Sequence, residues 1–122
     1  MSATHAPGIT IGRGRRGRGV FAAKAFKEGE IIEVCPTVIV PDEDVPEGVV
    51  RQYVFASRQP GKVMLVMGYA MLYNHSSTPN MFHRSAGRQL IEFVALHDIK
   101  KGEELTHDYG GEYWDDCGKT PK

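Results

Sequence analysis

The sequence predicts a single domain of mostly β structure, and three observations support that prediction. Residues 31–40 are rich in β-branched side chains, which are enriched in strands. Residues 62–67 and 90–96 are two further strand-like runs, and glycine or proline turns interrupt the chain between such runs. With 122 residues, of which 41% are hydrophobic, the chain has room for one modest core and should be globular.

Short strands and glycine-rich turns are expected in the first third of the chain. Residues 9–11 are a short β-prone run, and residues 19–23 follow a glycine-rich turn. A further turn at residues 27–30 leads into the strand at 31–40. Pro36 lies within that strand and suits an edge or a bulge, because proline has no backbone N–H to donate to a neighbouring strand.

The middle of the chain is less regular. Residues 41–46 are expected to form an acidic loop. Residues 47–57 are compatible with a helix, since their apolar side chains lie near helical spacing, and a strand is the open alternative. A turn is expected at residues 100–103. Residues 105–109 are short and polar for a central strand, which indicates that function constrains them.

Composition argues against several classes of protein. No run reaches the roughly 18 apolar residues of a membrane span, so no membrane partner is expected. The N-terminus lacks the apolar segment of a secretion signal, so secretion is not expected. Cys35 and Cys117 are far apart in sequence, which is more typical of free thiols in a reducing compartment than of a disulfide.

Charge is distributed unevenly although the net charge is zero. Residues 1–29 carry six basic groups and one acid, residues 30–50 carry six acids and no base, and residues 103–122 carry six acids and two bases. The two acidic segments are suited to a basic partner such as a lysine-rich tail. Ordinary solvated surface is the alternative interpretation.

One glycine pattern points to a different class of protein. Residues 12–17 match G-x-G-x-x-G, the fingerprint of dinucleotide-binding enzymes, in which the third glycine lies in a helix packed on the preceding strand. Gly19 would interrupt that helix, and the rest of the chain offers strands and prolines rather than alternating helices. The pattern therefore favours a glycine–arginine turn over a nicotinamide-dependent oxidoreductase.

Three sequence blocks carry the functional prediction. Residues 17–22 read Gly-Arg-Gly-Val-Phe-Ala, residues 74–80 read Asn-His-Ser-Ser-Thr-Pro-Asn, and residues 102–110 read Gly-Glu-Glu-Leu-Thr-His-Asp-Tyr-Gly. In this order and in so short a chain, they resemble the SET-domain protein-lysine methyltransferases, especially the compact viral members and their bacterial relatives. The resemblance runs from about Arg13 to Trp114.

The resemblance implies a fold and a division of the chain. It implies several small β-sheets, with the C-terminal segment threaded under a preceding loop as a pseudoknot. Residues 13–111 would form the SET domain, residues 1–12 an N-terminal extension, and residues 112–122 a tail that closes the cofactor site. The resemblance implies the cytoplasm for a bacterial protein, and the host nucleus or the virion for a viral one.

The methyl donor that the resemblance implies is S-adenosyl-L-methionine. Its sulfonium is already activated, so the protein mainly positions and desolvates the reactants. Tyr113 and Trp114 would cover the donor, or else pin the tail to the core as a hydrophobic anchor, and one ring can do both. The residues implied at the donor are Gly17, Arg18, Gly19, Asn74, His75, Tyr109, Tyr113 and Trp114.

The substrate implied is a lysine of a basic protein, of which a histone tail in chromatin is the typical example in the family. Tyr109 would be catalytic, aligning the lysine nitrogen and polarising the methyl group. Tyr53 and Tyr109 would line the channel through which the lysine arrives, and one more core aromatic is the alternative role for Tyr53. An apolar channel lowers the pKa of the lysine, so that it arrives neutral.

His107 departs from the family pattern, in which the residue two before the catalytic tyrosine tunes how many methyl groups are added. Tyrosine there restricts transfer and phenylalanine permits more. An imidazole in the pocket would hold a water, and its ionisation near neutrality predicts products that change between about pH 6 and 8. A ring that points away from the pocket is the alternative.

Other partners also follow from the sequence. Arg13, Arg15 and Arg16 predict weak contact with nucleic acid, with an exposed turn as the default. Compact relatives imply a homodimer. Since only Cys117 stands where larger SET enzymes carry a zinc-binding segment, no metal is expected. A non-catalytic module that binds a basic tail is the competing function, disfavoured because Tyr109 and Asn74 are present.

Overall fold

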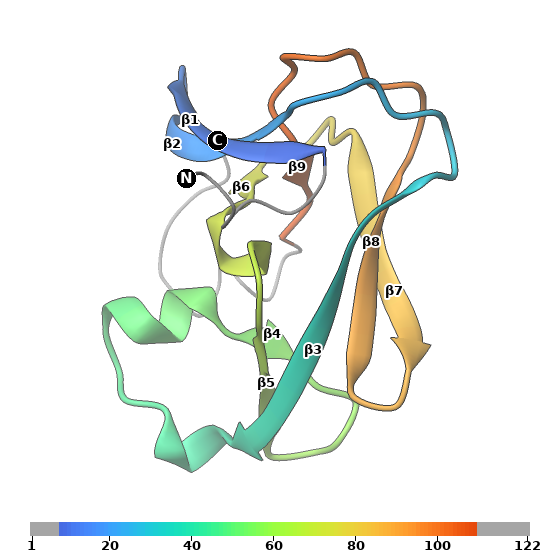
Figure 1. The fold of residues 1–122 in the computed structure, drawn as a ribbon. Coiled ribbons are helices and arrows are strands. Elements are labelled where there is room, and N and C mark those ends of the chain that lie inside the picture. The colour runs from blue at the N-terminus through green and yellow to red at the C-terminus, as the bar shows by residue number, and fades with distance from the viewer. Residues whose placement is uncertain (1–7, 110–122) are drawn as a thin grey trace, which may run out of the picture.

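The structure, a computed structural model, describes residues 8–109 and confirms the mostly β prediction. The strands form a two-stranded hairpin, a five-stranded antiparallel sheet in the order β4-β5-β3-β8-β7, and a parallel two-stranded sheet (Figure 1). The strands are β1 (Ile9–Gly14), β2 (Gly17–Ala22), β3 (Ile31–Pro41), β4 (Phe55–Ala56), β5 (Lys62–Val66), β6 (Asn74–His75), β7 (Met81–Gly87), β8 (Leu90–Ala95) and β9 (Thr106–His107). Three 3-10 helices are η1 (Asp42–Asp44), η2 (Val49–Tyr53) and η3 (Ala70–Leu72). No helix in the described part of the chain is long and apolar enough to cross a membrane.

The β1–β2 hairpin contains the glycine–arginine pattern. Gly14 lies opposite Gly17, so that only Arg15 and Arg16 form the turn, and Gly17 has a positive φ of 84° that favours glycine. The glycines at 12 and 14 lie in β1, and β2 follows where a dinucleotide-binding fold would have a helix. The hairpin thus confirms a turn and excludes the dinucleotide fingerprint.

Strand β3 changes partner at Pro36. Its first half pairs with β8 as far as Pro36, and its second half pairs with β5 from Thr37 onwards. Pro36 has no N–H, but its carbonyl accepts a 2.9 Å hydrogen bond from the Met67 amide. The register irregularity on this strand lies at Ile31 and Glu33 rather than at the proline. By changing partner, one long strand holds both parts of the large sheet together.

The C-terminal part of the chain lies between elements that come much earlier in sequence. Glu103 and Leu105 bond to β2, through Ala22 N–H to Glu103 O (2.8 Å) and Leu105 N–H to Val20 O (2.8 Å). Strand β9 then pairs in parallel with β6, with His75 opposite His107. This placement between the first and middle thirds of the chain is what the expected pseudoknot requires.

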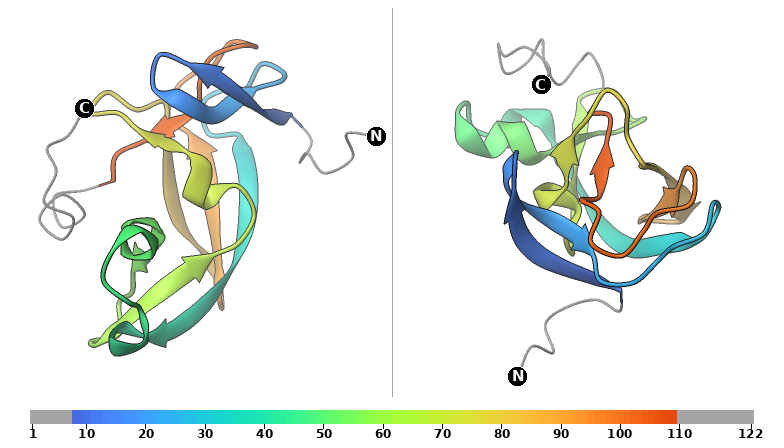
Figure 2. Two further views of the ribbon diagram at one scale, coloured as in Figure 1. Left: turned by 90° about the vertical axis from the view of Figure 1, so that its left-hand side faces the viewer. Right: turned by 90° about the horizontal axis from the view of Figure 1, so that it is seen from above.

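The core is enclosed between the large sheet and the hairpin. Its fully buried side chains include Val20 of β2, Tyr73, Phe93 of β8 and Leu105. Figure 2 shows the hairpin at one end of the long strands, with η1 and η2 at the other. The core therefore draws on elements from the whole described chain and includes Val20 and Leu105 of the sequence blocks.

Two local predictions need correction or completion. Residues 47–57 do not form an α-helix: η2 is a 3-10 segment that leads into β4. Val49 and Val50 of η2 are 67% and 55% exposed, so the apolar residues that favoured a helix bury no common face. Strand β7 was not predicted, because its sequence, Met-Phe-His-Arg-Ser-Ala-Gly, has no β-branched residue. Its pairing with β8 makes it a strand.

Residues 1–7 and 110–122 lie outside the described residues. They include most of the expected N-terminal extension and the whole expected tail. Residues 9–12 of that extension belong to β1, and Ile9 is part of the core.

Candidate active site

A cavity of about 950 Å³ brings the sequence blocks together. Its volume lies within the usual range for small-molecule sites. One part, here called the polar side, is lined by Arg18, Asn74 and His75. Another, called the aromatic side, is lined by Phe55, His83 and His107, and Tyr109 lines the same cavity. These residues come from β2, β4, β6, β7 and β9, so only folding assembles the site.

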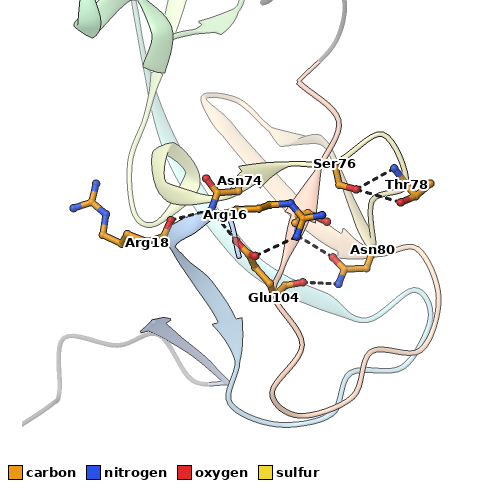
Figure 3. Close-up of polar contacts among 8 residues, drawn as sticks. Arg16, Arg18, Asn74, Ser76, Thr78, Asn80 and Glu104 are labelled. Atoms are coloured by element: carbon orange, nitrogen blue, oxygen red, sulfur yellow. Dashed lines mark hydrogen bonds and ion pairs between the residues drawn. The ribbon is translucent and has the colours of Figure 1, made fainter. Parts of the chain in front are cut away.

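Asn74 links the hairpin to the C-terminal segment. Its side-chain Nδ2 donates to the Arg18 carbonyl (2.8 Å) and to Glu104 Oε2 (2.7 Å), as Figure 3 shows. Both amide hydrogens are thereby used within the protein, which leaves the side-chain oxygen to accept a bond from a ligand. Asn74 is fixed in place before any ligand arrives.

Gly19 is required by this link. A Cβ at Gly19 would lie 2.3 Å from Glu104 Oε2 and 2.8 Å from Asn74 Nδ2. The close approach expected at this glycine is therefore, in the first place, an approach to the protein's own polar groups. At Gly17, by contrast, nothing lies within 4 Å of the position a Cβ would take, and neither Gly17 nor Gly19 lines the cavity.

Asn80 holds the segment that leads to Tyr109. Its Nδ2 donates to the Glu104 carbonyl (2.8 Å), and its Oδ1 accepts from the Thr106 amide (2.9 Å). One buried side chain thus supplies both hydrogen bonds that a neighbouring strand would give (Figure 3). Asn80 was part of the recognised block but was not among the predicted site residues. Its spacing from Glu104 in sequence gives no sign of this contact.

Tyr109 is held at two points. Its backbone amide donates to His75 Nδ1 (3.0 Å), and its hydroxyl donates to the Tyr73 carbonyl (2.5 Å). Its ring lies 5.3 Å from that of His75 and 5.0 Å from that of His107, measured between centroids. Tyr109 therefore lies where the polar and aromatic sides meet.

His75 serves this arrangement as a neutral ring. Because its Nδ1 accepts the Tyr109 amide, that nitrogen carries no proton in this contact. Burial lowers the pKa of His75, against the opposing effect of the Asp108 carboxylate 3.7 Å away. A hydrogen bond and desolvation thus favour the same protonation state.

His107 lies in a cluster of aromatic rings. It is 3% exposed, stacks on Phe55 with an interplanar angle of 4°, and meets Phe93 and His83 edge-on at 5.4 and 5.8 Å. Neither ring nitrogen has a hydrogen-bond partner among residues 8–109. The ring lines the cavity rather than facing solvent.

The protonation of His107 corrects one expectation. Burial, with a smaller effect from His83, lowers the pKa of His107 to about 3. The ring is therefore neutral throughout the range between about pH 6 and 8, and ionisation of His107 cannot change the products there. The expected pH dependence treated this histidine as if it were solvated.

The remaining predicted residues are placed as follows. Tyr53 is 39% exposed and lines the cavity, so it is not a core side chain. Tyr113 and Trp114 lie outside the described residues. Phe55, His83 and Tyr73 contribute to the site without having been predicted, because no motif marks them. Their contacts join strands that are distant in sequence.

The arrangement has a definite chemical capacity. The Asn74 oxygen and the Arg18 cation on the polar side suit a polar ligand, whereas the aromatic side disfavours charge and would keep an amine neutral. The Tyr109 hydroxyl donates a hydrogen bond to the Tyr73 carbonyl. Its oxygen lone pairs are therefore available where the polar and aromatic sides meet. Group transfer to a neutral amine is the chemistry that this junction fits.

Comparisons with known proteins agree with this geometry. A family model described as the SET domain matches residues 17–110. A histone-lysine N-methyltransferase of Schizosaccharomyces pombe, named as specific for H3 lysine-37, is 30% identical over 105 residues, which cover 82% of this chain and 71% of that protein. An N-lysine methyltransferase of Danio rerio is 30% identical, over 78% of this chain and 33% of that protein. A Plasmodium falciparum crystal structure, assigned as a histone methyltransferase, is 32% identical with a TM-score of 0.74, covering 90% of this chain and 99% of the other.

Proposed function

Because the chain belongs to the SET-domain family of protein-lysine methyltransferases, we propose that it transfers methyl groups from S-adenosylmethionine to the side-chain amine of lysine in a basic protein. One observation carries the proposal beyond family membership. The Tyr109 hydroxyl, fixed on the Tyr73 carbonyl, lies where a polar side and an aromatic side of one cavity meet. A methyl donor and an apolar lysine channel need such a junction.

The residues present fit the donor. Asn74 uses both hydrogens of its amide nitrogen within the protein, which leaves its side-chain oxygen to accept a hydrogen bond from the donor, and Gly17 directly precedes Arg18 in the hairpin. Arg18 is exposed at the cavity and offers a cation for a carboxylate. Gly17, Arg18, Asn74 and His75 would hold the donor. When bound, S-adenosylmethionine would supply a methyl group on a positively charged sulfur, and the neutral thioether formed as the methyl group is transferred is a good leaving group.

The protein's own groups would act on the acceptor amine. The apolar rings around His107 disfavour an ammonium ion and lower the lysine pKa, so that the nitrogen presents its lone pair. Tyr109 would orient that nitrogen and accept weak C–H···O bonds from the transferring methyl group. His107, with both nitrogens unpartnered among the described residues, would hold a water beside the amine and limit its rotation.

Acidic side chains near the cavity support a basic substrate. Asp42 and Glu47 line it, and Arg51 partly neutralises them, at 2.8 Å from Asp42 and 3.6 Å from Glu47. Glu43 and Asp44 of η1, which stands where an acidic loop was expected, are exposed beside Asp42. A lysine-rich segment such as a histone tail fits this charge.

The proposal is tested by mass spectrometry. The chain is incubated with methyl-labelled S-adenosylmethionine and core histones, with Tyr109→Phe as the matched control, and donor binding is measured separately by calorimetry. Labelled methyl on lysine, reduced in the control, is the expected result. Donor binding without methylation of any basic protein would instead favour the non-catalytic module.

We also propose contact with nucleic acid, through Arg13, Arg15 and Arg18 rather than through the predicted Arg13, Arg15 and Arg16. Arg16 is paired with Glu104 at 3.3 Å, which removes it from the predicted basic arm. Arg13 lies opposite Arg18 on the hairpin, and both are exposed, as is Arg15 at the turn. Like charges placed opposite each other are unfavourable, and phosphate would relieve that cost. Binding to duplex DNA that weakens with salt, and is lost in Arg13→Ala/Arg15→Ala, would support this contact.

The homodimer also belongs among the proposals. Val34 and Val38 on β3 and Met67 are exposed apolar side chains that an interface would bury. Light scattering that gives about twice 13.5 kDa would support a dimer.

A further inference from the structure

We infer that Glu33 is a positioning residue for Tyr109, acting through the backbone of Tyr73. This inference rests on the proposed function, because it assigns a role in methyl transfer to a carboxylate outside the recognised sequence blocks. Glu33 lies on β3 and is 9% exposed. It does not line the cavity, so its effect on the reaction must pass through other groups.

One carboxylate fixes both ends of the η3 turn. Glu33 Oε2 accepts a 2.9 Å hydrogen bond from the Tyr69 amide, directly before η3. Glu33 Oε1 accepts a 2.7 Å hydrogen bond from the Tyr73 hydroxyl, directly after η3. A buried carboxylate needs donors, and each of its oxygens has one here. The turn is therefore held between two charge-assisted hydrogen bonds.

The two hydrogen bonds of Glu33 to Tyr69 and Tyr73 are here called the Glu33 clamp. The residues packed around the clamp leave its groups little room to move. Gly68 has a φ of 81°, and a Cβ there would lie 2.4 Å from Glu33 Oε2, so the chain approaches the carboxylate as closely as glycine allows. The Tyr73 ring is fully buried and packs on Phe93 at 4.8 Å. Burial and the Glu33 carboxylate both raise the pKa of Tyr73, which keeps its hydroxyl a donor.

The clamp ends at the Tyr73 carbonyl oxygen, which accepts the hydrogen bond of the Tyr109 hydroxyl. The Tyr73 carbonyl accepts the Tyr109 hydroxyl at 2.5 Å, and Asn74 and His75 of β6 follow directly in the chain. A shift of the η3 turn would therefore move the acceptor that orients the Tyr109 hydroxyl. Misplacement of a catalytic group by about 1 Å can cost on the order of a hundredfold in rate.

Two substitutions weaken the clamp without touching the cavity. Glu33→Gln keeps the shape but removes the negative charge from both hydrogen bonds, and its amide nitrogen can only donate, so the bond with the Tyr73 hydroxyl is reversed or lost. Tyr73→Phe removes the other partner and keeps the backbone carbonyl. Ile32→Val is the matched control, since Ile32 is a buried neighbour on β3 that forms no bond with the turn.

The test is a double-mutant cycle with Tyr109→Phe, which has no hydroxyl to position. In the chain with Tyr109, we expect Glu33→Gln and Tyr73→Phe each to lower kcat about tenfold while KM changes less than about twofold. In the Tyr109→Phe background, the same substitutions should lower kcat no further. Ile32→Val should leave kcat unchanged in both backgrounds.

Each outcome decides the matter. An equal loss of kcat in both backgrounds would show that Glu33 is only a structural anchor and would overturn the inference. Unchanged kcat in either clamp variant with Tyr109 present would also overturn it. If Glu33→Gln does not fold, Tyr73→Phe alone completes the cycle. Turnover by the unmodified chain tests the proposed function separately, and its absence would end both proposals.

Discussion

Polar side chains are paired on one side of the cavity, whereas on the other side aromatic rings meet without hydrogen bonds. Asn74 and Glu104 bond to each other on the polar side, and Arg16 completes the set. Around His107 the contacts are ring to ring, with Phe55 and His83 as neighbours. The polar side is preorganised by partners within the protein. On the aromatic side, neither ring nitrogen of the buried His107 has a hydrogen-bond partner among residues 8–109.

With one polar and one aromatic side, a small domain can serve two reactants of opposite character. A network of satisfied hydrogen bonds fixes geometry at little cost on binding, because its groups are already desolvated and paired. An apolar wall instead acts by excluding water, which shifts the protonation of whatever enters it. Tyr109 belongs to both sides, so substitution of Tyr109 should have the largest effect on the reaction.

The largest effect is expected for Tyr109→Phe. The hydroxyl at the junction is lost, while the ring contacts with His75 and His107 and the amide bond to His75 can persist. Turnover should fall by a factor on the order of a hundred or more, with donor affinity nearly unchanged. Steady-state kinetics and calorimetry measure the two quantities. A variant that keeps most of its activity would show that the Tyr109 hydroxyl has no part in catalysis.

Asn80→Ala tests how far the hydrogen bonds behind the polar side, which hold the segment leading to Tyr109, determine stability. The substitution leaves the Glu104 carbonyl and the Thr106 amide without their partner. The free energy of unfolding should fall by about 2 kcal/mol. Urea denaturation measures it, with Ser85→Ala, at an exposed position on β7, as the control. Equal stability of the two variants would mean that Asn80 is not needed to hold the C-terminal segment.

The buried histidine of the aromatic side predicts a pH-dependent stability. The folded pKa of His107 is depressed to about 3 from 6.5, so the unfolded chain binds the proton more tightly. Stability is then fully present above about pH 6.5 and is lost progressively as the pH falls towards 3. At pH 5 the loss from this group should be about 2 kcal/mol.

Denaturation at pH 7.5 and pH 5 would measure this loss in the unmodified chain and in His107→Phe. The variant should lose less stability on acidification, keeping only the contributions of groups such as His75 and His83, whose pKa values are also lowered. Identical losses in the two proteins would place His107 in a wetter environment than the aromatic side provides.

A smaller effect is expected at the end of the chain. The proposed tail, residues 112–122, would close over the donor through Tyr113 or Trp114. Deleting it should weaken donor binding more than about tenfold, equivalent to roughly 1.4 kcal/mol. Calorimetry on the truncated chain measures this change. Unchanged affinity would leave the polar side of the cavity sufficient by itself.

The most subtle change concerns products on the aromatic side. His107→Tyr should shift products towards monomethyl-lysine and His107→Phe towards di- and trimethyl-lysine, because the group holding the water beside the amine changes in size and polarity. Since His107 is neutral near pH 7, the product ratio of the unmodified chain should not vary between about pH 6 and 8. Mass spectra of methylated peptides at both limits test this. Identical spectra for all three proteins would remove His107 from the control of multiplicity.

The residues that act through local identity were readable from the sequence. The hairpin glycines, Asn74 and Tyr109 belong to short blocks whose residue types and order resemble a known family, and strong β-branched runs such as 31–40 predict strands because steric preference is local. The identity and order of these residues are visible in the sequence itself. The resemblance to the family can therefore be recognised before the structure is known.

Only the tertiary structure decided how those residues are held. Glu33 meets Tyr73 40 positions away, Asn80 spans Glu104 and Thr106, and His107 lies against Phe55 and His83. No sequence spacing encodes such contacts, because they depend on which strands pair and in which register. The same holds for the pKa of His107, since burial among side chains from distant elements lowers it below the ordinary value of a histidine.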